Sequence, residues 1–167
     1  MRLDDQNIAD RIAIEERILL YAHYLDSLQF ELLAAEVFTE DAVVDFGGTQ
    51  ARGRAAIHAQ VMSYRDAMVG CSHNMSNMII DVAGDDARAS TRVIAWHWFT
   101  GDPDPFAPSQ LVAVGGYEDR LRRQVDGWRI YERRGLSFGT GIGSGSVPEP
   151  MKPIWEQMWG RRPTFPA

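Results

Sequence analysis

The sequence predicts an α+β domain in which three N-terminal helices pack in a curved, mostly antiparallel sheet. Apolar residues recur at helical spacing over the first part of the chain, and from Ser72 onward their period changes to two, which is typical of strands. At 167 residues the chain fits one domain that can bury a core and still enclose a pocket at one open end of the sheet.

Three helices are predicted before the long strands. Asp4 and Asp5 can cap the first helix, which ends near Asp26 and repeats apolar residues at Ile8, Ile12, Ile18, Leu19 and Ala22. A second, short helix fits residues 30–37, and a β-branched strand follows over residues 42–46. The third helix carries a buried stripe formed by Ile57, Val61, Tyr64 and Met68.

Four strands with alternating apolar residues come next, over residues 73–82, 87–100, 111–124 and 128–138. The turns at 83–86 and 126–127 contain residues that tolerate positive φ, so successive strands should pair as antiparallel hairpins. We therefore expect one α+β domain over residues 1–142.

A glycine-rich connector and an apolar tail make up residues 143–167. The tail repeats large apolar residues at helical spacing: Met151, Ile154, Trp155, Met158 and Trp159. Such a stripe is usually core packing. Because it follows a flexible connector, we expect it to cover the pocket mouth or to cross onto a second subunit.

Composition excludes several classes of function. The net charge of -6 and the pI of about 5.2 argue against a nucleic acid partner, which requires a basic face. Cys71 is the single cysteine, so an intramolecular disulfide and a cysteine-based metal cluster are excluded. The first ten residues lack the apolar core of a signal peptide, and no apolar run is long enough to cross a bilayer, so we expect a cytoplasmic protein without a membrane partner.

Four polar residues on otherwise apolar elements are candidates for chemistry. Tyr21 and Asp26 lie near the end of the first helix, and His73 and His97 lie on two predicted strands. An enclosed Asp can fix the tautomer of a His that moves protons near neutral pH, so these groups predict a cofactor-free acid–base site. The competing interpretation is that each is a buried polar group with satisfied hydrogen bonds.

Metal and cofactor sites have weak support in the sequence. The two histidines are not at helical ligand spacing, and a third ligand would have to be Asp26. No glycine-rich segment follows a strand and opens a helix, which argues against a dinucleotide or phosphate-binding loop. We therefore expect neither a metal ion nor a cofactor.

Strand alternation assigns the two histidines to a cavity face and a set of large apolar residues to the opposite face: Trp96, Trp98, Val112 and Val114. A single small domain rarely buries both faces of a sheet, so we expect the second face to form a homo-oligomer, either a dimer or a trimer. Six arginines between residues 120 and 134 alternate with acidic residues, which favours a solvated, charge-paired hairpin.

A set of short motifs spans about residues 8 to 138: Ile14-Glu15-Glu16, Tyr24-Leu25-Asp26, Val37-Phe38-Thr39-Glu40-Asp41-Ala42, Gly53-Arg54-Ala55-Ala56-Ile57, Ser72-His73-Asn74 and Asp126-Gly127-Trp128-Arg129-Ile130. Together they resemble the polyketide cyclase-like (SnoaL-like) branch of the nuclear transport factor two superfamily. The resemblance implies a cone-shaped, cystatin-like fold with three helices in front of a curved sheet, which agrees with the order of elements predicted above.

The resemblance also implies roles for individual residues. Scytalone dehydratase, a bile-acid dehydratase and hexachlorocyclohexane dehydrochlorinase pair an Asp at the end of the first helix with a His on the first strand of the meander, and Asp26 and His73 match these positions. His97 resembles the second active-site histidine of scytalone dehydratase. Tyr21 resembles the phenol that the bile-acid enzyme and ketosteroid isomerase carry on this helix.

One departure from the superfamily counts against steroid isomerisation. Ketosteroid isomerase has its general-base Asp near the end of the strand after the second helix, where this sequence has Phe46. Asp45 is adjacent, but in a regular strand its side chain points to the other face. The same fold hosts several chemistries, so the residues must decide among them.

The sequence and the resemblance together predict a cofactor-independent lyase of the dehydratase type that acts on a small, mostly apolar cyclic molecule. His73 removes a proton, Asp26 holds its other ring nitrogen, Tyr21 donates to the enolate oxygen, and His97 protonates the departing hydroxyl. Further contacts to the substrate are expected from Tyr24, Phe46, Met75, Trp128 and Arg134. The alternatives are an isomerase or cyclase that uses the same dyad, or a non-catalytic protein that binds a small ligand.

Overall fold

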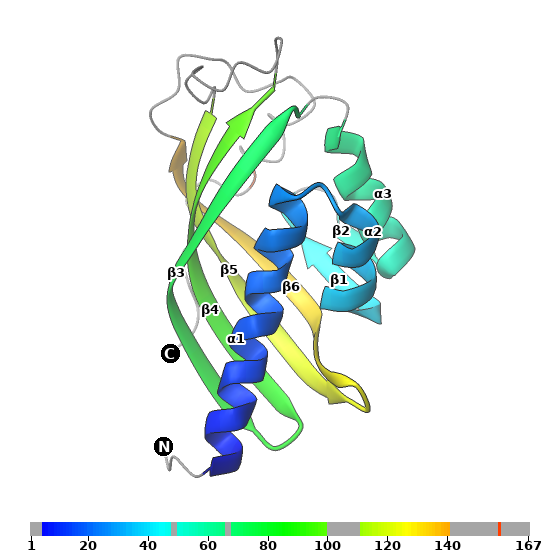
Figure 1. Ribbon diagram of the computed structural model, residues 1–167, viewed down its shortest axis with the longest axis vertical. Helices are drawn as coiled ribbons and strands as arrows, with labels where there is room; N and C mark the ends of the chain where they lie inside the picture. Colours follow the sequence, from blue (N-terminus) through cyan, green and yellow to red (C-terminus); the bar gives the residue numbers. More distant parts are fainter. Residues whose placement is uncertain (1–4, 48–49, 66–67, 100–110, 141–156, 158–167) are drawn as a thin grey trace.

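The computed structural model describes residues 5–47, 50–65, 68–99, 111–140 and 157, and it confirms the α+β fold class (Figure 1). The elements follow in the order α1 (Asp5–Asp26), α2 (Phe30–Leu32), η1 (Leu33–Val37), β1 (Phe38–Asp45), β2 (Gln50–Arg52), α3 (Arg54–Arg65), β3 (Gly70–Ala83), β4 (Asp86–Trp98), β5 (Leu111–Gln124) and β6 (Gly127–Thr140). Apart from Gln157, the predicted connector and tail lie outside the described residues.

The strands form one six-stranded sheet in the order β2-β1-β6-β5-β4-β3. The four predicted strands of the meander pair as antiparallel neighbours, whereas β1 joins β6 in parallel. Strand β2, which the sequence analysis missed, has three residues and is too short for a periodic pattern. Figure 1 shows the long strands curving around α1, with α2, α3, β1 and β2 gathered on one side.

The helices supply one wall of the core. Helix α1 buries Ile14, Ile18, Tyr21 and Leu25, which recur every three or four residues along one face. The predicted second helix is a short α-helix that continues as the π-helical turn η1. Helix α3 buries Ile57 and Val61, but it ends at Arg65, so the predicted helical residue Met68 is buried beyond the helix. None of the described helices is both long and apolar enough to cross a membrane.

A bulge in β3 reverses the predicted faces of its second half. The register between β3 and β4 shifts between Ser76 and Ile79, and Asn77 has a φ of 47°. Ile80 is therefore buried, whereas Ile79 is 47% exposed. Regular alternation along the predicted strand 73–82 would place Ile79 on the face of His73, and this expectation is wrong because an extra residue in one strand changes the alternation.

A second bulge has the same effect in β6. Leu121 pairs with Ile130, but the preceding residue of β5, Arg120, pairs with Glu132, so Tyr131 is an extra residue. Regular alternation along the predicted strand 128–138 would place Arg134 on the face of Ile130, and this expectation is wrong because of the extra residue. Its neighbour Arg133 is fully buried.

Strands β5 and β6 approach each other closely at Gly115. A Cβ atom added there would lie 2.1 Å from the carbonyl oxygen of Leu136. No side chain fits at such a distance, so the local register of the two strands depends on glycine at this position. This segment of the sheet forms part of the cavity wall.

Candidate active site

A cavity of about 120 Å³ lies between the helices and the inner face of the sheet. Most of its lining is apolar: Leu25, Phe46, Val61, Met68, Val93, Ala95, Ala113 and Leu136. The polar side chains around it are Tyr21, Tyr64, His73, His97 and Tyr117. A mostly apolar recess with a few converging polar groups can hold a small ligand.

Asp26 and His73 form a hydrogen-bonded dyad at the wall of this cavity. The Oδ1 atom of Asp26 lies 2.7 Å from Nδ1 of His73, and its Oδ2 atom accepts a 2.9 Å hydrogen bond from the backbone N–H of His73. The His73 side chain is 7% exposed and the Asp26 side chain is 30% exposed. The carboxylate therefore holds both the ring and the backbone of one residue.

The ionisation of Asp26 determines the tautomer of His73. Burial by itself raises the pKa of Asp26, but hydrogen bonds from the ring and the backbone of His73 outweigh burial and hold this pKa below its ordinary value. An ionised carboxylate can only accept hydrogen bonds, so Nδ1 of His73 must donate. In the neutral ring Nε2 then carries the lone pair, and it is the nitrogen that can take a proton from a ligand.

His97 lies next to the dyad. Its ring centroid is 5.6 Å from that of His73, and it stacks on Phe99 at 5.7 Å with an interplanar angle of 2°. Burial, followed by the neighbouring His73, lowers the pKa of His97 to about 4. At neutral pH the ring is uncharged, and this state does not suit the predicted role of His97 as the proton donor to a departing hydroxyl.

Two tyrosines from different elements meet at the cavity. The rings of Tyr21 on α1 and Tyr117 on β5 are 5.5 Å apart with an interplanar angle of 75°, and Phe46 lies 6.0 Å from Tyr117. Burial raises the pKa of Tyr117 to about 12 and raises the pKa of Tyr21 well above its ordinary value. Both phenols therefore keep their protons and can donate hydrogen bonds to a ligand.

A buried ion pair supports the two tyrosines. The guanidinium of Arg133 donates to both carboxylate oxygens of Asp119, at 2.7 and 2.8 Å, and both side chains are fully buried. Its Cζ atom lies 4.1 Å from the ring centroid of Tyr21 and 4.3 Å from that of Tyr117. The prediction of a solvated hairpin is wrong at these two positions, because a strand bulge turns Arg133 inward.

Sequence reasoning missed Tyr117, Arg133 and Asp119. Tyr117 lies in a predicted strand and alternates correctly with its neighbours, so a lone polar aromatic on the cavity face was the signal available in the sequence. The inward direction of Arg133 depends on the bulge, for which the sequence holds no periodic signal.

Four of the predicted substrate contacts do not line this cavity. Tyr24 lies three residues after Tyr21 on α1 and is half-buried, with its ring 5.6 Å from that of His23. Met75 lines a separate groove between α1 and β3. Of the five predicted contacts, Phe46 is the one that the structure brings to the cavity.

Trp128 and Arg134 lie in other parts of the fold. Trp128 is buried in the core, where its Nε1 atom donates to Asp10 at 3.3 Å. Arg134 forms a 2.8 Å ion pair with Glu118, a neighbour across β5 and β6. Neither residue is positioned to contact a ligand beside His73.

One group of described residues has metal-ligand chemistry. The ligand atoms of Asp26, Cys71 and His73 lie within 4.8 Å of one another. However, burial and the nearby Asp26 raise the pKa of Cys71 to about 12, and its thiol donates to the carbonyl of Leu25 at 3.5 Å. A metal ion would have to displace the proton of a buried thiol and separate the bonded atoms of Asp26 and His73, so the donor set fits a dyad better than a metal centre.

Comparison with known proteins identifies the family. Residues 6–134 match the SnoaL-like domain. The uncharacterised protein Rv2910c of Mycobacterium tuberculosis is 31% identical over 136 residues, which cover 75% of this chain and 84% of that protein.

Solved structures agree with this match. A candidate scytalone dehydratase of Novosphingobium aromaticivorans is 26% identical and superposes with a TM-score of 0.74, covering 87% of this chain and 100% of the other. A nuclear transport factor two-like protein from the same organism, with a cystatin-like fold, is 29% identical with a TM-score of 0.65 and covers 86% and 93% of the two chains. A hexachlorocyclohexane dehydrochlorinase shares the fold at 16% identity, with a TM-score of 0.70 and coverage of 85% and 95%. The chain therefore belongs to the SnoaL-like family and has its cystatin-like α+β fold.

Proposed function

We propose that this protein is a cofactor-independent lyase of the dehydratase type that acts on a small, mostly apolar cyclic molecule. The observation that carries the proposal is the double hydrogen bond by which Asp26 holds His73 at the wall of an apolar cavity. A His with a fixed tautomer and an ionised partner is the arrangement that a general base requires. The likeness to a candidate scytalone dehydratase supports this reaction class.

In the proposed reaction, Nε2 of His73 removes a proton from a carbon next to a carbonyl group. Asp26 stabilises the imidazolium that forms, and Tyr21 donates a hydrogen bond to the enolate oxygen. The enolate then expels the hydroxyl group, which takes the proton from His73 and leaves as water. This route returns His73 to its starting state and requires no proton from the neutral His97.

The lining of the cavity constrains the substrate. The described residues around the cavity include no arginine or lysine, and the nearby Arg133 is already paired with Asp119. A carboxylate or phosphate group would therefore lose its hydration without gaining a cationic partner. We expect a neutral ring whose polar groups are hydroxyl or carbonyl oxygens.

A product-mass assay tests the proposal. The protein is incubated with a panel of cyclic hydroxy-ketones, steroids and chlorinated rings, and the products are weighed by mass spectrometry. Loss of one water or one hydrogen chloride supports a lyase, whereas a rearranged product of unchanged mass supports an isomerase or cyclase. Binding of a panel member without any conversion supports a non-catalytic ligand-binding protein.

Matched variants assign the activity to the dyad. His73→Asn and Asp26→Asn should each lower turnover by at least about 100-fold, because positioned acid–base groups contribute about 10²- to 10⁴-fold. His23→Asn is the control, since His23 is an exposed histidine on the same helix as Asp26. If both dyad variants turn over substrate like the control, the proposed mechanism is wrong.

We also propose that the chain forms a homo-oligomer through the outer face of its sheet. Ile94 and Val114 lie opposite each other on β4 and β5 and are 40% and 37% exposed, with Trp96 beside them half-buried. Exposed apolar residues grouped in this way favour a protein interface. Ile94→Asp should shift the mass measured by light scattering toward the monomer, and an unchanged mass would contradict this assignment.

A further inference from the structure

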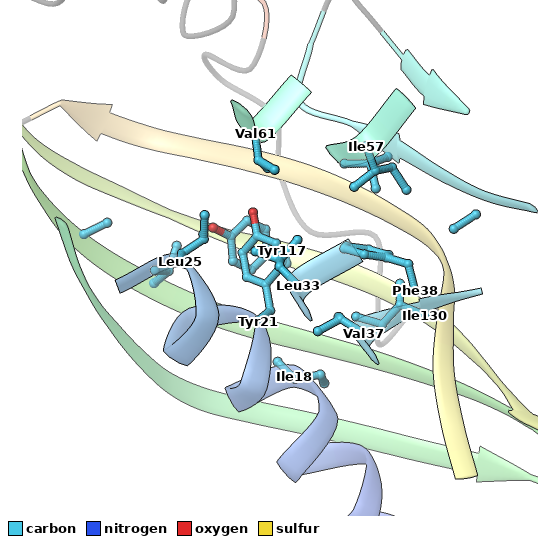
Figure 2. Close-up of a cluster of buried hydrophobic side chains, with 14 of the residues drawn as sticks. Ile18, Tyr21, Leu25, Leu33, Val37, Phe38, Ile57, Val61, Tyr117 and Ile130 are labelled. Carbon is cyan, nitrogen blue, oxygen red and sulfur yellow. The ribbon is translucent and has the colours of Figure 1, made fainter. Parts of the chain in front are cut away.

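The hydroxyl groups of Tyr21 and Tyr117 point to the same side of the core, toward Leu25 and Val61 (Figure 2). Both tyrosines line the cavity together with Leu25 and Val61. The two phenols therefore converge on one region of the cavity wall, although one belongs to a helix and the other to the sheet.

The two phenols, which line the cavity together, have a proton available for a ligand. Each hydroxyl carries one proton and can accept further bonds. The two rings lie 5.5 Å apart, so a bond from one hydroxyl to the other would use one of the two protons and leave the second one unused. At least one O–H group can thus be directed at an oxygen atom in the cavity.

Arg133 holds the two rings in place and favours charge on their oxygens. Its guanidinium contacts both rings and is itself fixed by two hydrogen bonds to Asp119. The positive charge lowers the pKa of both phenols, although burial dominates and keeps both protonated. A phenol polarised by a cation is a stronger hydrogen-bond donor toward an oxygen that gains negative charge.

We infer that Tyr21 and Tyr117 form one two-donor site for an oxygen atom that becomes negatively charged, such as the carbonyl oxygen of an enolisable ketone. The inference rests on the proposed function for its place in a reaction, and it adds Tyr117 as a second residue that contacts the reacting group. The dyad supplies the base, and the two phenols stabilise the charge that the base creates.

The test uses 4-nitrophenol as a probe, because its phenolate has the charge and the oxygen geometry of an enolate and absorbs visible light. The wild-type protein is titrated with the probe at a pH where the free probe is mostly protonated. We expect the bound probe to show the phenolate absorption band. Binding of the protonated form, or no saturable binding, would overturn the inference.

Variants locate the donors. Tyr21→Phe and Tyr117→Phe should each weaken phenolate binding by roughly 10- to 100-fold, the range for a hydrogen bond to a charged group. The matched control is Tyr131→Phe, because Tyr131 also has a stacked arginine, Arg122, at 4.5 Å but does not line the cavity. If Tyr117→Phe binds the phenolate as tightly as Tyr131→Phe, Tyr117 is not a donor.

The same probe separates this inference from the proposed function. His73→Asn should lower turnover by at least about 100-fold but retain phenolate binding, because the phenols can donate hydrogen bonds without the base. Retained turnover in His73→Asn would refute the base and leave the two-donor site standing. Normal phenolate binding in the double variant Tyr21→Phe/Tyr117→Phe would refute the two-donor site, whatever the dyad does.

Discussion

Replacement of Arg133 by methionine should destabilise the fold far more than a typical surface substitution. The variant leaves the buried carboxylate of Asp119 without its 2.7 and 2.8 Å hydrogen bonds, and it removes the cation from between the rings of Tyr21 and Tyr117. Breaking a buried ion pair from one side costs about 3–5 kcal/mol. Loss of the two ring contacts adds about 1 kcal/mol or more.

This cost is large compared with the stability of a typical domain, which is about 5–15 kcal/mol. The double variant Arg133→Met/Asp119→Leu should recover most of it, because two apolar side chains replace the pair and no unpaired charge remains. The matched control is Arg134→Met. Arg134 is the next residue on β6, and its pair with Glu118 is partly exposed, so it should cost at most about 1 kcal/mol.

Urea unfolding followed by tryptophan fluorescence measures these free energies of unfolding. The control Arg134→Met should be the most stable of the three variants. The double variant Arg133→Met/Asp119→Leu should come next, and Arg133→Met should be the least stable. A cost below about 1 kcal/mol for Arg133→Met would refute the reasoning, because it would mean that Asp119 is not an uncompensated buried charge in that variant. A double variant as unstable as the single variant would refute the pair as the source of the cost.

Three other predictions concern the cavity wall and the groups beside the dyad. Gly115→Ala should lower the free energy of unfolding by about 3 kcal/mol or more, measured by thermal unfolding, because its Cβ would lie 2.1 Å from the Leu136 oxygen. The control Gly70→Ala should lower it little, because the nearest atom to its Cβ would be 3.9 Å away. The pKa of His97 falls from 6.5 to about 4 on folding, so His97 should lower the stability progressively from pH 6.5 down to pH 4, and His97→Gln should remove that loss. Cys71→Ala and treatment with EDTA should both leave turnover unchanged.

Each of these predictions has a clear contradicting result. Equal stability of the two glycine variants would show that β5 and β6 can separate at Gly115. If the wild type and His97→Gln lose stability in parallel between pH 7 and pH 4, the His97 prediction is wrong. That result would mean that His97 binds its proton equally well in the folded and the unfolded protein. Loss of turnover with EDTA, restored by added zinc, would favour a metal centre at Asp26, Cys71 and His73.

The sequence predicted the fold well because most elements carry regular periodicity. The bounds of α1 and the four long strands agree with the predicted ones within a few residues. The dyad could be predicted for a similar reason, since Asp26 ends one periodic element and His73 lies near the start of another. Helix α1 lies beside β3 in the structure, and this contact joins the two residues (Figure 1).

The positions of the other site residues depend largely on strand bulges, which interrupt the periodic pattern. The bulge at Tyr131 moves Arg133 to the inner face and Arg134 away from it, and the bulge at Asn77 similarly reverses the second half of β3. A bulge is a local register shift with no sequence signal as regular as alternation. The prediction that Trp128 contacts the substrate failed for a different reason. Trp128 faces inward, but it lies near the start of β6, away from the part of the strand that lines the cavity.

The central claim is that His73 and Asp26 act as one proton-transfer unit, and a double-mutant cycle on substrate turnover tests it most directly. A cyclic hydroxy-ketone that the wild-type protein dehydrates serves as substrate, and kcat/KM is measured for His73→Asn, Asp26→Asn and the double variant. The double variant should be about as slow as His73→Asn alone, because Asp26 acts through His73. Two independent losses that multiply in the double variant would contradict it.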